Sequence, residues 1–396
     1  MMNDKMVNRL AWIICFALCI QRLSMALGSI SWGIAILLFI ILIYKTKRTG
    51  QSLAIEESFK GYYQAYLICA VSFIPSIFVS SDIGSAMKLF FEMWLYRVIP
   101  FFMVTVFIKD TALLKKILFV FLSVINIDCL VAATQVFLGV APRGWGFGGN
   151  TLHLASILCV IIPMLLVVVL DDTFLKKEKR FACISLFFCF IGVIAGLSRG
   201  AWLTFAIVLP LLSIKYIMNN TKRIIASCSI IVLVIGIFIS SPKLLYRVES
   251  ISNVTTDTSN LARLAVWQSG LNMLRDYPVT GVGLSSFVEV YKIKYTLPDD
   301  KIGLSHAHNN FVQIGAETGI VGLLGFLYLN CYIIIRNFAE WKKDQNPFSL
   351  MLLSGWMGFT IFGMLDLTID ASAIMKILWF LLGTILVLKS NQHLKR

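Results

Sequence analysis

Twelve apolar runs, each long enough to cross a lipid bilayer, constrain this 396-residue chain more than any other feature. A helix needs about 20 mostly apolar residues to cross the roughly 30 Å hydrocarbon core. The runs therefore predict an all-α polytopic membrane protein with about twelve transmembrane helices and a single integral membrane domain over residues 1–396. The predicted spans are 10–27, 28–44, 61–80, 86–107, 113–138, 151–170, 181–198, 200–217, 224–241, 310–335, 347–366 and 371–388.

The composition leaves no room for a large soluble domain. Hydrophobic residues make up 58% of the chain and charged residues only 14%, whereas a soluble domain is about half apolar and a quarter charged. An ordinary cytoplasmic enzyme is therefore excluded. The nine cysteines all fall inside apolar stretches and form no CxxC pair. We interpret them as small buried hydrophobes, neither disulfides nor metal ligands.

The formal charge of +14 is mostly a matter of topology. A cytoplasmic amino terminus places 22 of the 35 Lys and Arg residues in inner segments, as the positive-inside bias requires. Both termini are thus predicted to lie in the cytoplasm, and nucleic acid is not an expected partner. A cleaved signal peptide ending near residues 26–28 is the alternative for the first span. Arg22 near its end and the eleven further spans favour an uncleaved helix.

Two outer connections are longer than a tight turn: residues 139–150, and residues 242–309 between the ninth and tenth spans. The second is predicted to be a partly helical periplasmic loop. It carries seven basic and six acidic residues, so it has no polyanion-binding patch and any anion must be bound by individual arginines.

Within the long loop, Ser259-Asn260 can cap a helix that Pro278 ends. Arg263 and Trp267 are four residues apart on it, so the guanidinium can lie along the indole ring and be held in one direction. The alternative is a helix that rests on the membrane surface with a snorkelling arginine.

Two further arginines are predicted at the outer boundary. Arg199 lies in the turn between the seventh and eighth spans, where an arginine is costly to bury and either snorkels to water or serves a site. Arg143 and Asn150 flank a glycine-rich run in the shorter loop, which either shapes a pocket or turns the chain.

The most informative run covers residues 305–322, where the long loop re-enters the membrane. His308 can act as a general base towards a sugar hydroxyl, because imidazole titrates near neutrality. His306 and His308 could instead supply two zinc ligands, but the nearby sequence offers no Cys or further His to complete the site. A structural histidine remains a third interpretation. The glycines at 315, 319 and 322 predict a face that another helix can approach closely.

At this point the sequence resembles the O-antigen ligase and polymerase superfamily of polytopic membrane glycosyltransferases. His308-Asn309, nine residues, and then Gly319-Ile320-Val321-Gly322 reproduce the H-[NSQ]-x9-G-x-x-G pattern of the ligases. Ser198-Arg199-Gly200 and the segment from Arg263 to Trp267 resemble the arginine motifs of the family. Twelve spans with one large periplasmic loop also agree with its GT-C-like architecture.

The resemblance implies transfer of an undecaprenyl-diphosphate-linked glycan to the lipid A-core acceptor, at the periplasmic face of a Gram-negative inner membrane. No metal, cofactor or nucleotide sugar is implied, and the anomeric configuration would invert. His308 would deprotonate the acceptor hydroxyl, and Arg199 and Arg263 would hold the diphosphate. Arg275 is a secondary diphosphate candidate, unless it is a solvated charge beside Asp276. Asn309, Arg143 and His306 are expected to shape the site.

Three other functions stay open. A Wzy-type polymerase would use a second lipid-linked glycan as the acceptor, but its Arg-x10-Gly pattern is absent after each outer arginine tested and the loop at 139–150 is short. A transporter or flippase would account for the charges in or beside the spans, which otherwise pair inside the bundle. A scaffold of a polysaccharide complex would not depend on Arg199, Arg263 or His308 individually.

Overall fold

The computed structural model describes residues 2–50, 53, 55–217, 245, 257–297 and 303–393. The predicted span 224–241 lies outside these residues. The described helices, in chain order, are α1 (Met2–Leu23), α2 (Met25–Arg48), α3 (Glu57–Ser72), α4 (Ile74–Phe78), α5 (Ile83–Phe91), η1 (Glu92–Tyr96), α6 (Ile99–Phe107), α7 (Thr111–Phe137), η2 (Gly146–Gly148), α8 (Thr151–Leu170), α9 (Lys176–Gly196), α10 (Arg199–Ile217), α13 (Thr258–Asp276), α14 (Phe287–Val290), η3 (Tyr291–Tyr295), α15 (Asn310–Asp344), α16 (Pro347–Gly363) and α17 (Ser372–His393).

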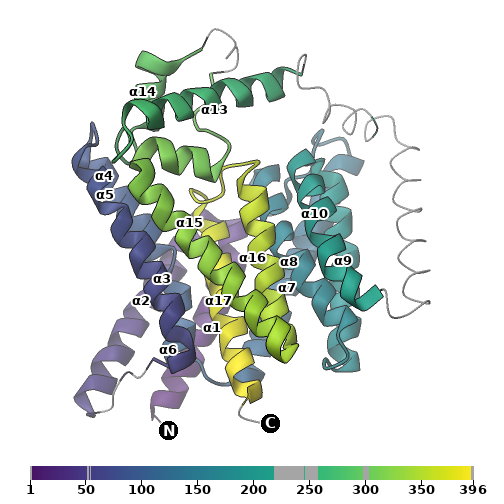
Figure 1. The fold of residues 1–396 in the computed structure, drawn as a ribbon. Helices are drawn as coiled ribbons and strands as arrows, with labels where there is room; N and C mark the ends of the chain where they lie inside the picture. Colours follow the sequence, from purple (N-terminus) through teal and green to yellow (C-terminus); the bar gives the residue numbers. More distant parts are fainter. Residues whose placement is uncertain are drawn as a thin grey trace.

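The described part of the chain is an all-helical bundle that fits a polytopic membrane protein. Nine of its helical segments are long and apolar enough to cross a membrane, and the apolar parts of α10 and α16 are shorter. These segments account for eleven of the twelve predicted spans. The start of α1 and the end of α17 lie at one end of the bundle, and α13 and α14 cover the opposite end (Figure 1).

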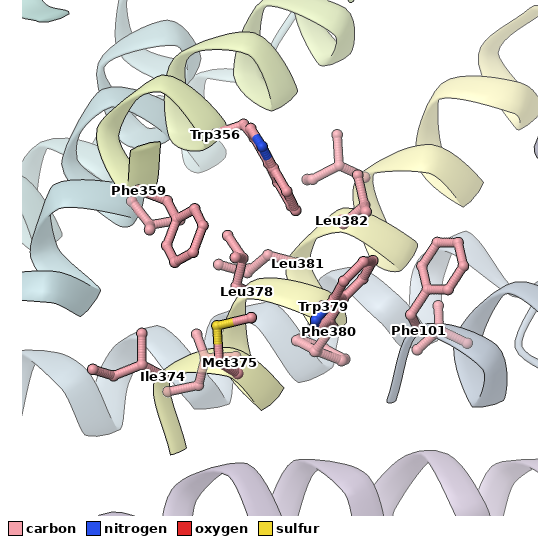
Figure 2. Close-up of a cluster of buried hydrophobic side chains, with 14 of the residues drawn as sticks. Phe101, Trp356, Phe359, Ile374, Met375, Leu378, Trp379, Phe380, Leu381 and Leu382 are labelled. Carbon is pink, nitrogen blue, oxygen red and sulfur yellow. The ribbon is translucent and has the colours of Figure 1, made fainter. Parts of the chain in front are cut away.

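The centre of the bundle is formed by α17 and α8, the most enclosed of the candidate spans. The Trp379 ring of α17 packs against Trp356 of α16, with ring centroids 5.8 Å apart, and against Phe101 of α6, at 5.7 Å. Figure 2 shows this cluster of aromatic and branched side chains between the three helices. The outer helices instead leave large apolar side chains exposed, such as Ile30 and Leu37 of α2, both 60% exposed. A bilayer solvates this apolar surface.

The cysteines were predicted to be buried, and only some of them are. Among the described residues all eight are free of disulfides, and five are buried. Cys183 of α9 and Cys331 of α15 are exposed, because they lie on helix faces that no other described helix covers. Cys228 lies outside the described residues.

The charges within the spans are mostly paired. Arg22 of α1 and Asp128 of α7 form a buried ion pair at 2.8 Å, and Asp128 also accepts a hydrogen bond from the backbone of Phe147 at 2.6 Å. Arg97 contacts Glu92 at 3.3 Å and Asp370 at 3.9 Å. These ion pairs agree with the prediction that charges in the spans pair with one another inside the bundle. A transport path was the other explanation for these charges.

Two predicted spans are interrupted. The span at 61–80 bends at Phe73, where α3 ends and α4 begins with Pro75 in its first turn. The span at 86–107 contains the wider turn η1, and α6 begins with Pro100 in its first turn. Proline lacks a backbone N–H and its ring clashes with the preceding turn, so these positions favour a break, although Pro163 and Pro210 lie inside the continuous helices α8 and α10.

A third break lies in α15 at Gly319, whose φ of 63° and ψ of −164° are not helical. Residues 278–283 run alongside it. The amides of Val282 and Gly283 donate to the carbonyls of Ala316 and Glu317, and the amide of Ile320 donates to the carbonyl of Pro278. The broken helix therefore keeps its backbone groups paired within the protein, as a membrane-embedded segment requires.

Gly319 was predicted to face another helix, and that prediction is wrong. A Cβ on Gly319 would lie 2.3 Å from the backbone of Val279, so the glycine admits a crossing loop segment and allows the positive φ. A Cβ on Gly322 would lie 2.0 Å from the Oγ1 of Thr318, a side chain of the same helix.

The outer helix α13 is present, but its cap lies earlier than predicted. Asp257, not Ser259-Asn260, is the N-cap, and its carboxylate accepts a hydrogen bond from the amide of Asn260 at 2.9 Å. The helix ends at Asp276, two residues before Pro278. Its inward face is made of small residues, because it lies close to α15: a Cβ on Gly270 would lie 2.5 Å from Val312.

We predict that Gly319→Ala lowers the free energy of unfolding by about 2 kcal/mol or more, since it adds a clash with Val279 to an unfavourable φ. Gly33→Ala in α2 is the matched control, because a Cβ added there meets nothing within 4 Å and a helix interior favours alanine by roughly 0.5–1 kcal/mol. Chemical unfolding of both variants in detergent measures the difference. Equal stability of the two variants would contradict this account of the break.

Candidate functional site

A cavity of about 80 Å³ lies where α8, α10, α13 and α16 meet, at the end of the bundle that α13 covers. Three arginines, Arg143, Arg199 and Arg263, line it together with one carboxylate, Asp366. Its remaining lining residues are small or apolar: Leu152, Leu197, Ser198, Gly200, Ser259, Phe362 and Leu365. The lining therefore has a net formal positive charge, which favours an anionic ligand.

The first turns of three helices also meet at this cavity. Leu152, Gly200 and Ser259 line it, and each lies in the first turn of its helix, α8, α10 and α13. The amino-terminal end of a helix carries unpaired N–H groups and about half a positive charge. Their convergence adds to the field of the arginines and suits an anion such as a phosphate.

The local sequence explains how two of these helices begin. Asn150 caps α8 and accepts a hydrogen bond from the amide of Leu152 at 2.8 Å. Leu197 ends α9 with a left-handed φ of 47°, and Ser198 accepts from the amide of Ala201 at 3.4 Å. This tight turn places Arg199 at the first position of α10.

The three cavity arginines differ in their partners. Arg199 pairs with Asp257 at 3.2 Å. The Nε of Arg143 donates to the carbonyl of Gly196, at the end of α9, at 2.9 Å. Arg263 forms no ion pair within the part of the chain that the structure describes. Burial lowers the pKa of Arg263, and Asp366 opposes this shift; the group stays protonated at neutral pH.

His308 lies in the described segment 303–309, just before α15, and specific hydrogen bonds hold its neighbour Ala307 in place. Its neighbour Ala307 is fully buried; the amide of Ala307 donates to Gln313 at 2.9 Å, and its carbonyl accepts from the Nε1 of Trp267 at 2.7 Å. His308 itself has a φ of 47°, a left-handed conformation that costs a side-chain-bearing residue about 1 kcal/mol or more.

The imidazole of His308 is held by a carboxylate from a distant part of the chain. Its Nδ1 lies 2.7 Å from the Oδ1 of Asp366, which follows α16. The amide of Leu367 donates to the same oxygen at 3.0 Å, so the orientation of the carboxylate is set. With Nδ1–H directed at Asp366, the Nε2 of His308 carries the free lone pair. The Nε2 of His308 can therefore accept a proton from a substrate hydroxyl. Asp366 contacts His308 and also lines the cavity that contains the arginines.

His306 packs against His308, with ring centroids 4.0 Å apart. Burial first, and then the His308 ring, lower the pKa of His306 to about 4. His306 is therefore neutral at physiological pH, which suits it to hydrogen bonding and not to carrying charge.

His306, His308 and Asp366 each offer one metal-ligand atom, and these atoms lie within 4.8 Å of one another. The sequence offered only the two histidines; the fold adds the third donor. The contact of 2.7 Å between Nδ1 and the carboxylate has the length of a hydrogen bond, and it occupies Asp366 in orienting the imidazole.

Three predicted site residues have other positions or roles. Arg275 is exposed near the end of α13, about 18 Å along the helix from Arg263 at 1.5 Å per residue, and does not line the cavity. Asn309 is the N-cap of α15 and accepts from the amides of Phe311 and Val312. Trp267 bonds to Ala307, and the described residues include no contact of its ring with Arg263.

Residues 184–327 match a family model described as O-antigen ligase. The match covers about a third of the chain and is consistent with a member of the O-antigen ligase and polymerase superfamily. The match points to a membrane glycosyltransferase-like enzyme of O-antigen processing, and the family implies lipid-linked glycan substrates. A search of curated proteins gives no match. The matched segment contains Arg199, Arg263, Arg275 and His308 but ends before Asp366.

Sequence reasoning missed Asp366 as the partner of His308 and Asp257 as the partner of Arg199. One signal was available for Asp366: the predicted topology ends the span at 347–366 on the same side of the membrane as His308. The same topology places Asp257, 58 residues from Arg199, in the outer loop, but that loop has six acidic residues and the topology does not choose among them.

We predict that stability falls as the pH drops from about 6.5 to 4, in part because of His306. The unfolded imidazole binds a proton below its ordinary pKa of about 6.5, whereas the folded one does so only near pH 4. The unfolded state thus binds more protons in this window, and protonation favours unfolding. His306→Gln is expected to make the unfolding midpoint less dependent on pH between 7.5 and 4.5. An unchanged dependence would contradict the burial of a neutral His306.

Proposed function

We propose that this protein is an O-antigen ligase. It transfers a glycan from undecaprenyl diphosphate to the lipid A-core oligosaccharide in lipopolysaccharide biosynthesis, with inversion at the anomeric carbon and without a metal or other cofactor. The family match supports the reaction class, and the ligase pattern from His308 to Gly322 favours a ligase over a polymerase.

One observation carries the proposal: Asp366 lines the arginine cavity and at the same time hydrogen-bonds His308. A glycosyl transfer from a lipid diphosphate needs a site for the leaving group beside a base for the acceptor. Here the arginine-lined cavity would hold the leaving group and His308 would be the base, and Asp366 contacts both.

The diphosphate would bind in the cavity. Its charge increases as the bond between the anomeric carbon and the phosphate oxygen breaks, and the electron pair goes to that oxygen. Arg263 and Arg199 would stabilise this charge, because guanidinium groups form paired hydrogen bonds to phosphate oxygens. Arg143 and the helix N-termini would add to the field. The leaving group then needs no proton.

The acceptor would bind beside His308. As its hydroxyl oxygen bonds to the anomeric carbon, the hydroxyl proton passes to the Nε2 of His308, and Asp366 stabilises the resulting imidazolium. Attack from the face opposite the diphosphate inverts the configuration. His306 and Asn309 would shape the acceptor side, and Arg275 could meet only a part of a substrate that extends beyond the cavity.

We further propose that the protein is located in the inner membrane of a Gram-negative bacterium, with both termini cytoplasmic and the site facing the periplasm. Two observations support this orientation. The positive-inside bias places most Lys and Arg at inner segments, and the described ends of α1 and α17 lie opposite the end with α13 (Figure 1).

Reconstitution tests the function. The purified protein in detergent is supplied with undecaprenyl-diphosphate-linked glycan and lipid A-core, with a chelator and without ATP. Glycan on lipid A-core is the expected product. Longer glycan still on undecaprenyl diphosphate would indicate a polymerase instead, and loss of product on chelation would indicate a metal at His306, His308 and Asp366.

In the same assay, we expect His308→Ala to lower turnover by about 100-fold or more, as for loss of a general base, and Arg263→Ala to lower it by about 100-fold. Lys292→Ala is the matched control, because it removes an exposed positive charge near the same end that does not line the cavity. Normal turnover of the His308 and Arg263 variants, with correct folding, would reject the site.

A further inference from the structure

Asn310 joins the segment that carries His308 to the segment that carries Asp366. It is the first residue of α15 and its side chain is almost fully buried, at 1% exposure. Its Nδ2 donates to the Oγ1 of Thr368 at 2.8 Å. Its Oδ1 accepts from the amides of Thr368 at 2.8 Å and Ile369 at 3.3 Å. One amide side chain thus uses most of its hydrogen-bonding capacity on two consecutive residues.

These bonds repeat the spacing of the His308–Asp366 contact. His308 and Asp366 are 58 residues apart in the chain, and so are Asn310 and Thr368. The two segments are therefore joined at two points. The second contact, between Asn310 and Thr368, lies two residues after the first in both segments. A displacement at Thr368 must move Asp366, because only Leu367 separates them.

The segment of residues 364–371 depends on such contacts because it is not helical. The amides of Thr368 and Ile369 are bonded by Asn310, and the amide of Leu367 by Asp366 itself. From the other side, the Nη1 of Arg97 donates to the carbonyl of Ile369 at 2.5 Å. Backbone carbonyls bond the amides of residues 364–366 and 371. Side chains thus set the course of the middle of this segment, at residues 367–369.

Gly363 provides the space that the Asn310 amide occupies. It is the last residue of α16, and a Cβ there would lie 2.3 Å from the Nδ2 of Asn310. Any larger residue at this position would displace the amide from Thr368.

We propose that Asn310 is a positioning residue for transfer: it acts through residues 364–371 to hold Asp366 against the Nδ1 of His308. Asn310 does not touch the substrate. This inference rests on the proposed function, because it assigns Asn310 to the same base.

A double-mutant cycle tests the proposal in the reconstituted assay, with Asn310→Ala, Asp366→Asn and the double variant. We expect Asn310→Ala to lower kcat about tenfold with KM unchanged for both substrates, since a small misplacement of a catalytic group has costs of this order or more. In the Asp366→Asn background, Asn310→Ala should change kcat by less than about twofold, because contacts in one network are not additive.

Asn330→Ala is the matched control for a merely structural effect. Asn330 is also on α15, is 2% exposed, and accepts from Trp356 at 3.0 Å and Thr360 at 3.1 Å, both on α16. Its replacement removes a similar link between α15 and α16, far from the site, and should leave kcat unchanged.

Two milder variants cover the case in which Asn310→Ala fails to fold. Thr368→Val removes only the bond to Oγ1, and Gly363→Ala displaces the amide; both should lower kcat with KM unchanged and lose this effect in the Asp366→Asn background. An unchanged kcat in folded variants, or an equal loss in both backgrounds, would overturn the proposal. An Asp366→Asn variant with full activity would also overturn it, because Asp366 would then not matter for transfer. A wild-type protein without transfer would instead reject the proposed function.

Discussion

Every backbone N–H and C=O group inside the apolar phase must have a partner within the protein, and the site depends on how this chain meets that constraint. Regular helices meet it internally. Where a helix is interrupted, another segment must supply the partners. Residues 278–283 do so at Gly319, and Asn310 and Arg97 do so for Thr368 and Ile369, between α16 and α17. Both interruptions lie on elements that build the site, so its irregular backbone is fixed by specific contacts.

The basic groups of the site are also partly matched by carboxylates of the protein itself. Three arginines and three helix N-termini make the cavity positive, yet the fold places a carboxylate beside two of the basic groups: Asp257 at Arg199 and Asp366 at His308. Removal of either carboxylate would leave its basic partner without this contact. Arg263 has no ion pair among the described residues, and we propose that its charge meets the anion. A diphosphate can thus be bound without the protein having to break each of its own ion pairs.

Most membrane-spanning helices could be predicted from the sequence, because the length of an apolar run is a local property of the chain. Eleven of the predicted spans correspond to described helices, although the breaks at Phe73, at residues 92–96 and at Gly319 were not predicted. Pro75, two residues after Phe73, was a visible signal. At Gly319 the same residue type suits either a close helix contact or a positive φ, and only the presence of residues 278–283 decides between them.

For the site, the sequence by itself singled out the residues that we propose carry the chemistry: His308, Arg199 and Arg263 stand out because a titratable or charged side chain at a membrane boundary is costly without a purpose. It also determined the membrane architecture, since a bilayer admits few alternatives to helices of this length. Only the tertiary structure decided that Asp366 orients His308, that Asn310 holds the segment of Asp366, that Arg143 reaches the cavity and that Arg275 does not. These are contacts between residues far apart in the chain, and their formation depends on how helices pack and where they break, which no local pattern encodes.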